Sequence, residues 1–123
     1  MFLVSNEKIA PGSGSRNDFT SEQWTNLNAF VARLTSLSSS IPAFDYSLYA
    51  IWSLRSAFEG AEMDPAHAEA GKVWFLYAKD IIEQLSQEEK NFEDKLAAPG
   101  SKYSEKEWVG FSPDRLGIWK AAL

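Results

Sequence analysis

The 123-residue sequence contains no cysteine and a single histidine, His67. The lack of cysteine excludes disulfide bonds, thiolate metal sites and cysteine nucleophiles. It also favours a reducing compartment, since small secreted domains usually depend on disulfides. Phosphate loops, dinucleotide fingerprints and the paired Glu-x-x-His motifs of di-iron bundles are missing as well. We therefore expect no metal and no cofactor.

Long apolar runs and basic clusters are also missing. No stretch reaches the roughly 20 apolar residues of a membrane-spanning helix. Lysine and arginine number 12 against 17 acidic residues, giving a net charge of −5 that disfavours nucleic acids and anionic membranes as partners. The apolar start of the chain, Met1 to Val4, is too short for the core of a signal peptide. We predict a cytoplasmic protein that binds neither nucleic acid nor membranes.

What is present is the composition of one folded domain, with 45% hydrophobic and 24% charged residues. Pro, Gly and Ser dominate the beginning, which predicts a tail or loop over residues 1–19. The remainder shows helix signals and no alternating strand pattern. We therefore predict a single all-α domain over residues 20–123, a compact bundle with four main helices: about 20–38, 43–59, 65–97 and 113–122.

The helix signals differ in strength along the chain. Thr20 and Gln23 form a capping box before a regular apolar stripe. Asp64 and Pro65 are a cap and a first helical residue. The apolar seam after Pro65 continues to about residue 96, but a straight helix of that length would span roughly 50 Å and overhang a small domain. Ser86 resembles a second cap, so a kink or short turn near residue 86 stays open.

Four segments together resemble a known family: NAFVARLT at 28–35, FDYSLYAIWSLRSAFE at 44–59, AGKVWFLYA at 70–78 and GFSPDRLGIWK at 110–120. Their order and spacing are similar to those of uncharacterised, mostly ascomycete fungal proteins that share a domain of unknown function. The resemblance covers residues 25–120. Members are usually longer, which implies that this chain is trimmed on its N-terminal side, and Leu116 stands where a tryptophan is expected. The resemblance implies a helical, intracellular fungal protein and no known activity.

Arg55 and Glu59 are the most informative charged pair. They lie one turn apart on a face of apolar residues, where a charge needs a partner. We expect them to form a structural ion pair, so that replacing Arg55 by alanine would destabilise the fold mainly by leaving Glu59 unpaired. The alternative is an anchor for a ligand carboxylate or phosphate, at which Arg33 and Arg115 could converge.

The remaining ligand-binding candidates are His67 and four aromatic residues. His67 follows a helix start, where an exposed position is usual and a role as general acid or base is the alternative. Seventeen aromatic residues, 14% of the chain, predict either a core built from large side chains or an aromatic-lined pocket or surface. The pocket or surface would form around Tyr49, Trp52, Trp74 and Tyr77.

Three functions fit these observations. The first is a non-catalytic helical module that binds a protein partner or a second copy of itself as a homodimer. The second is a small biosynthetic enzyme of the cyclase or isomerase type, acting on an apolar small molecule in the aromatic pocket. The third is a carrier of such a molecule without chemistry. An enclosed pocket containing Arg55, Glu59 or His67 would favour the enzyme.

Overall fold

The computed structural model describes residues 19–123, so the predicted tail of residues 1–19 lies outside the described part apart from Phe19. The described chain forms four α-helices and two short 3-10 helices: α2 (Ser21–Ser36), η1 (Pro42–Phe44), α3 (Ser47–Phe58), α4 (Pro65–Gln87), η2 (Ser101–Tyr103) and α5 (Pro113–Ala122). Within these residues no strand forms, and one isolated antiparallel bridge joins Asn91 to Gly110. The prediction of an all-α fold with four helices is confirmed.

The helix starts are built by the predicted caps. In α2 the Thr20 hydroxyl accepts a hydrogen bond from the Gln23 amide at 3.1 Å, and the Gln23 side chain accepts one from the Thr20 amide at 2.9 Å. The Asp64 carboxylate accepts from the Ala66 amide at the start of α4. Each of these bonds satisfies an N–H group that the first helical turn leaves unpaired.

Helix α3 begins later than the predicted residue 43. Pro42 to Phe44 form the separate 3-10 turn η1, and the helix starts only at Ser47. Before this start the Asp45 carboxylate accepts a hydrogen bond from the Ser47 amide at 2.9 Å, a local turn that competes with helix, and Tyr46 at the N-cap position makes no side-chain capping bond. The helix ends at Phe58, close to the predicted end at 59.

The prediction that the third helix reaches residue 97 is wrong. Helix α4 ends at Gln87, and Glu89 and Asp94 then adopt left-handed backbone angles, with φ of 52° and 53°. The chain turns back because Phe92 packs against Phe111, with ring centroids 6.3 Å apart. The alternative of a short turn near residue 86 is confirmed, because the helix ends one residue later and the chain turns there. A separate kink lies inside α4 at Ala78, the only residue of this helix with non-helical backbone angles.

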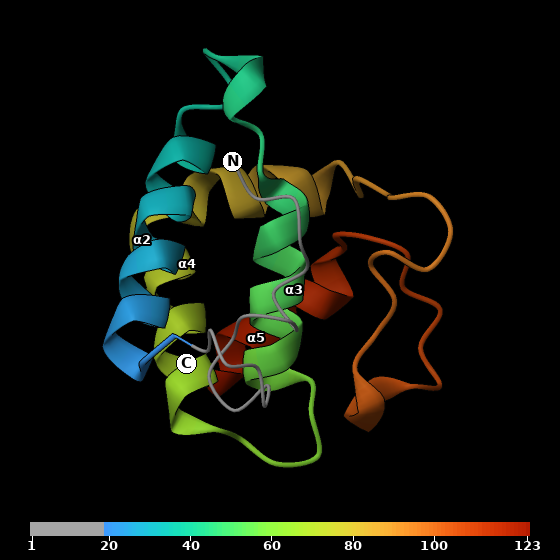
Figure 1. The fold of residues 1–123 in the computed structure, drawn as a ribbon. Helices are drawn as coiled ribbons and strands as arrows, with labels where there is room; N and C mark the ends of the chain where they lie inside the picture. Colours follow the sequence, from blue (N-terminus) through green and yellow to red (C-terminus); the bar gives the residue numbers. More distant parts are fainter. Residues whose placement is uncertain (1–18) are drawn as a thin grey trace.

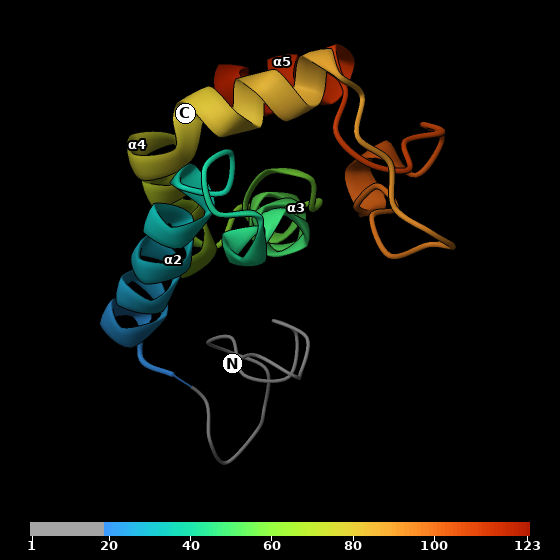
Figure 2. The same cartoon turned by 90° about the horizontal axis from the view of Figure 1, so that it is seen from above.

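Helix α4 is the central helix of the described fold. The sequence pattern had indicated the second helix, α3, for this central position. Its first part lies beside α2, and after Ala78 it changes direction and runs behind α3 (Figures 1 and 2). It packs against all three other helices, whereas α2 and α3 touch little. The crossing with α3 requires Gly71, where a Cβ atom would lie 2.8 Å from the Cβ of Ala57. No helix of the described residues is long and apolar enough to cross a membrane.

Candidate functional site

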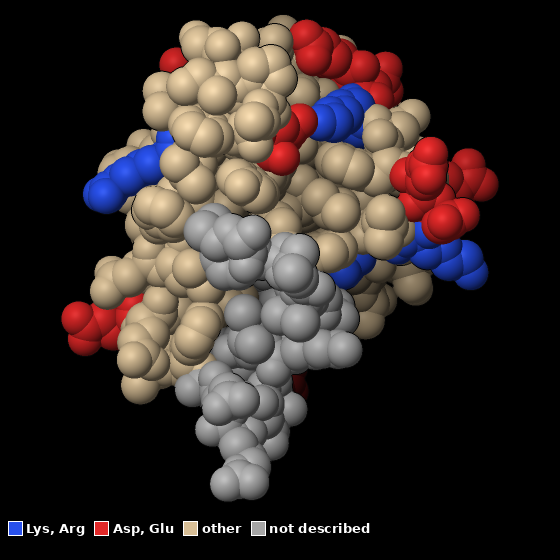
Figure 3. Space-filling model, turned by 45° about the horizontal axis from the view of Figure 1, so that its top comes forward, with Lys and Arg blue, Asp and Glu red and all other residues tan. Residues whose placement is uncertain are grey.

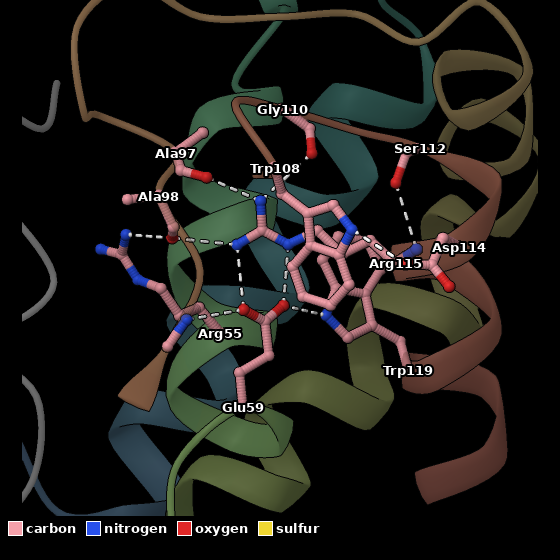
Figure 4. Close-up of polar contacts among 11 residues, drawn as sticks. Arg55, Glu59, Ala97, Ala98, Trp108, Gly110, Ser112, Asp114, Arg115 and Trp119 are labelled. Carbon is pink, nitrogen blue, oxygen red and sulfur yellow. Dashed lines mark hydrogen bonds and ion pairs between the residues drawn. The ribbon is translucent and has the colours of Figure 1, made fainter. Parts of the chain in front are cut away.

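The most strongly bonded polar group of the molecule is an ion pair between the end of α3 and the start of α5. The Arg115 Nε atom lies 2.8 Å from Glu59 Oε2, and Arg115 Nη2 lies 3.0 Å from Glu59 Oε1 (Figure 4). Both side chains are 0% exposed. This two-pronged geometry is the strongest form of an ion pair between a guanidinium and a carboxylate.

The remaining donors of Arg115 bind backbone carbonyls of the connection between α4 and α5. Nη1 donates to Ala97 at 2.6 Å and to Gly110 at 3.1 Å, and Nη2 donates to Ala98 at 3.1 Å. A guanidinium has five N–H groups, and all five are therefore used. The rings of Trp108 and Trp119 lie 5.1 and 5.5 Å from the guanidinium carbon and shield it.

The Glu59 carboxylate is equally saturated. Besides Arg115 it accepts hydrogen bonds from the Gly100 amide at 2.9 Å and from Trp119 Nε1 at 2.6 Å. Gly100 has to be glycine at this close approach, since a Cβ atom there would lie 2.5 Å from the Glu59 carbonyl oxygen. With every strong donor and acceptor occupied and no solvent access, the pair has no capacity to bind a substrate. It connects α3, α5 and residues 97–110 to one another.

The predicted ion pair between Arg55 and Glu59 is therefore wrong in its basic partner. Glu59 is paired with Arg115, and half-buried Arg55 donates to the Ala98 carbonyl at 2.9 Å. The sequence indicated correctly that Glu59 needs a cation. It could not indicate which one, because 56 positions separate Glu59 from Arg115 and helical spacing relates only near neighbours.

The four aromatic candidates lie in three separate environments in the described structure. Tyr49 and Trp52 are half-buried on α3, with ring centroids 5.2 Å apart. Trp52 Nε1 donates to the Leu96 carbonyl at 2.7 Å, and burial together with nearby Tyr46 raises the pKa of Tyr49. On α4, Tyr77 accepts a hydrogen bond from Arg33, whose guanidinium lies 4.3 Å from its ring.

Trp74, the fourth aromatic candidate, belongs to a neutral polar cluster that the sequence did not indicate. The cluster contains Asn28 of α2, Ser53 of α3 and Trp74 of α4, all less than 5% exposed. The Asn28 side-chain oxygen accepts from Trp74 Nε1 at 2.8 Å and from the Ser53 hydroxyl at 2.5 Å. Trp74 thus packs in the interior and ties three helices together.

His67 lies half-buried in the first turn of α4, against the indole of Trp24. The two rings meet edge to face at 6.3 Å. Both His67 Nδ1 and Trp24 Nε1 are buried without a hydrogen-bond partner. The Asp64 carboxylate caps the helix, as the simpler interpretation of its position predicted, and forms no hydrogen bond with His67. In the described part of the chain, no three His, Asp or Glu side chains are grouped closely enough to hold a metal ion.

Two apolar surfaces were not indicated by the sequence pattern. The first is the α2–α3 connection, residues 37–44, where Leu37 is 50% exposed and Ile41 41% exposed. The second is a groove of about 530 Å³ between α4 and the end of α5, with Leu76 70% exposed in it. The groove is lined by both apolar and charged residues: Glu69, Lys72, Val73, Phe75, Leu76, Lys79, Lys120 and Leu123.

Comparisons with known proteins agree with the resemblance seen in the sequence. No curated protein and no solved structure matches the chain. Residues 5–123, which include every described residue, match the family whose description is "Protein of unknown function (DUF3632)". The match brings no activity and no catalytic residues with it. The chain, whose described residues are all-α, belongs to this family, DUF3632.

Proposed function

We propose that the domain is a non-catalytic module that associates with a second copy of itself through the α2–α3 connection. One observation supports this most directly: the segment from Leu34 to Leu54 contains a single charged residue, Asp45, in a chain of net charge −5. Figure 3 shows a face of the molecule on which charged side chains lie mostly toward the edges. Exposed Leu37 and Ile41 belong to this segment.

Charge favours a second copy as the partner of this surface. A two-fold interface places the same patch opposite itself, so any unpaired charge in the patch would meet its own kind. The one charge here, Asp45, is paired with Lys90 at 2.6 Å. The segment 37–44 is much shorter than the roughly 20–30 residues that each partner of a stable complex contributes, so we expect a weak, concentration-dependent homodimer.

Sedimentation velocity from about 10 μM to about 1 mM tests the proposal. The wild-type chain should shift from monomer to dimer, and the double variant Leu37→Glu/Ile41→Glu should stay monomeric because it places acidic groups opposite each other. Val109→Glu changes another exposed apolar residue, 45% exposed, and should dimerise like the wild type. A monomer at every wild-type concentration would overturn the proposal.

Several finer predictions from the sequence stay proposals. They are an ascomycete fungal source, a cytoplasmic location, the division between a tail at 1–19 and a domain at 20–123, and ligand contacts by Tyr49, Trp52 or His67. Expression of a fluorescent fusion in a fungal host would test the location. The enzyme hypothesis gains no support here, since Glu59 is saturated and Trp74 is buried in a separate cluster.

A further inference from the structure

The groove between α4 and α5 differs from the α2–α3 connection in its charge. Its walls carry three lysines, at positions 72, 79 and 120, and one glutamate, Glu69. A second acidic residue, Glu83, lies beside the groove and bonds Lys120 at 3.0 Å. Among the side chains, basic groups outnumber acidic ones even with Glu83 included, whereas the side chains of the whole chain have an excess of five acidic groups.

The lysines are only weakly neutralised by their neighbours. The Lys72 Nζ and Glu69 Oε1 atoms are 3.4 Å apart, with side chains 51% and 62% exposed. Such exposed ion pairs have a small interaction energy, so Lys72 can still attract another carboxylate. The hydrogen bond from Lys120 lowers the pKa of Glu83, and the charge of nearby Lys79 acts in the same direction. Glu83 is bonded to Lys120 and leaves Lys79 without a carboxylate of its own among the described ion pairs. The groove therefore offers positive charge to a further partner.

The floor of the groove is apolar. Val73 and Leu76 lie three residues apart on the outer face of α4, with buried Phe75 beside them and Leu123 on the opposite wall. Leu76 is the most exposed large hydrophobic residue of the described chain, at 70%. The lining of α4 from Glu69 to Lys79 extends about 15 Å along the helix, which matches roughly three turns of a second helix.

These observations disfavour two other occupants. A second copy docked symmetrically on this groove would place lysines opposite lysines, which is unfavourable. A small acyl carboxylate would also match an apolar floor with a basic rim, but small-molecule sites bury most of their ligand. With Leu76 70% exposed, this groove is too open for that and suits the face of a longer partner.

We propose that this groove binds an acidic amphipathic helix of another protein, whose leucine-type side chains cover Leu76 and whose carboxylates reach Lys72 and Lys79. In this mode of recognition, apolar side chains at positions i, i+3, i+4 and i+7 of the partner helix contact the groove. The proposal is independent of the homodimer, because the two surfaces share no residue.

Three synthetic 14-residue amphipathic helices test the proposal, all with the same leucine face and with Glu, Gln or Lys at the polar positions. Fluorescence anisotropy with the full chain measures their binding. We expect the Glu peptide to bind at least about tenfold more tightly than the Gln peptide, and the Lys peptide not to bind. Raising the salt concentration should weaken the binding of the Glu peptide, since salt screens the charges of exposed lysines.

Variants locate the binding on the protein. Leu76→Asp should abolish binding of the Glu peptide, and the double variant Lys72→Glu/Lys79→Glu should reverse the preference toward the Lys peptide. Leu37→Glu/Ile41→Glu should bind like the wild type, and Leu76→Asp should still dimerise, which separates the two proposals. Circular dichroism melts confirm that each variant is folded.

Three outcomes would overturn the proposal. They are equal binding of the Glu and Gln peptides, binding that Leu76→Asp leaves intact, and no binding of any peptide at about 1 mM. Sodium dodecanoate is the fourth arm: if it binds at the groove and the Glu peptide does not, the site belongs to a small amphiphile.

Discussion

Two buried polar clusters hold this fold together, and they differ in charge and in what they connect. The neutral cluster of Asn28, Ser53 and Trp74 lies between three helices. The ionic cluster of Glu59, Arg115 and Trp119 fixes residues 97–110, a segment that has only a single 3-10 turn of regular structure. Neutral hydrogen bonds suffice where helices already pack. A non-helical segment needs the multiple donors of a guanidinium.

The largest expected effect comes from removing the cation of the ionic cluster. Arg115→Met retains much of the apolar volume but leaves the Glu59 charge buried without its partner, at a cost of about 3–5 kcal/mol. Urea unfolding measures this. Lys120→Met is the matched control, since it removes only the exposed pair with Glu83 and should cost less than about 1 kcal/mol.

A second variant keeps this prediction testable if Arg115→Met fails to fold. Glu59→Gln/Arg115→Met removes both charges, and the amide oxygen can still accept from one of the two donors, Gly100 or Trp119, which bond different oxygens of Glu59. The double variant should be more stable than Arg115→Met alone. If instead Arg115→Met has the same free energy of unfolding as the wild type, the ion pair does not hold residues 97–110 in place.

The neutral cluster should be the weaker of the two. Asn28→Leu leaves the Trp74 N–H without its acceptor and removes the partner of the Ser53 hydroxyl, which should cost about 2 kcal/mol in urea unfolding. Asn26→Leu changes an exposed residue of the same helix and should have little effect. A loss for Asn28→Leu equal to that of Arg115→Met would mean that charge does not distinguish the clusters.

Local signals predicted the helices well and the connections poorly. The caps at Thr20 and Asp64 were readable because a capping side chain bonds a backbone amide two or three residues away. The end of α4 was misread because the apolar seam continues to residue 96. Those apolar residues are used by a turn instead, as Phe92 contacts Phe111. The spacing of apolar residues alone does not show whether they pack along a continued helix or against a turn.

The predicted pairing of Arg55 with Glu59 was wrong for a related reason. Glu59 was correctly expected to need a cation, but Arg55 was chosen because it lies one turn away. The true partner, Arg115, reaches Glu59 only after the chain has passed through α4 and the connection that follows it. Asn28 and Leu76 gave no signal, because nothing in the sequence shows that one faces the interior and the other the solvent.

Three of the four buried tryptophans sharpen the comparison, since their indole N–H groups have different partners. Trp119 donates to the Glu59 carboxylate, Trp74 to the neutral Asn28 side chain, and Trp24 to no partner. Replacement by phenylalanine removes a similar volume in each case, so differences report the hydrogen bond. We expect the loss of melting temperature to rank Trp119→Phe first, Trp74→Phe second and Trp24→Phe third. Equal losses would show that only packing matters.

The smallest expected effect concerns an ion pair at the surface, Asp45 with Lys90 at 2.6 Å, with side chains 36% and 32% exposed. Burial raises the pKa of Asp45, but hydrogen bonds from Lys90 and Ser47 outweigh it and hold the pKa below its ordinary value of 3.8. Because the folded pKa is lowered, the stabilisation is complete above about pH 4 and is lost as the pH falls through the folded pKa. Asp45→Asn retains the oxygen that accepts from the Ser47 amide and removes only the charge. It should destabilise the domain by about 0.5 kcal/mol at pH 7, and the difference from the wild type should vanish at the acid end of a series of urea titrations. A difference in stability that persists at acid pH would assign the effect to the hydrogen bond with the Ser47 amide instead of the charge. A loss as large as that of Arg115→Met would mean that burial does not distinguish the two ion pairs.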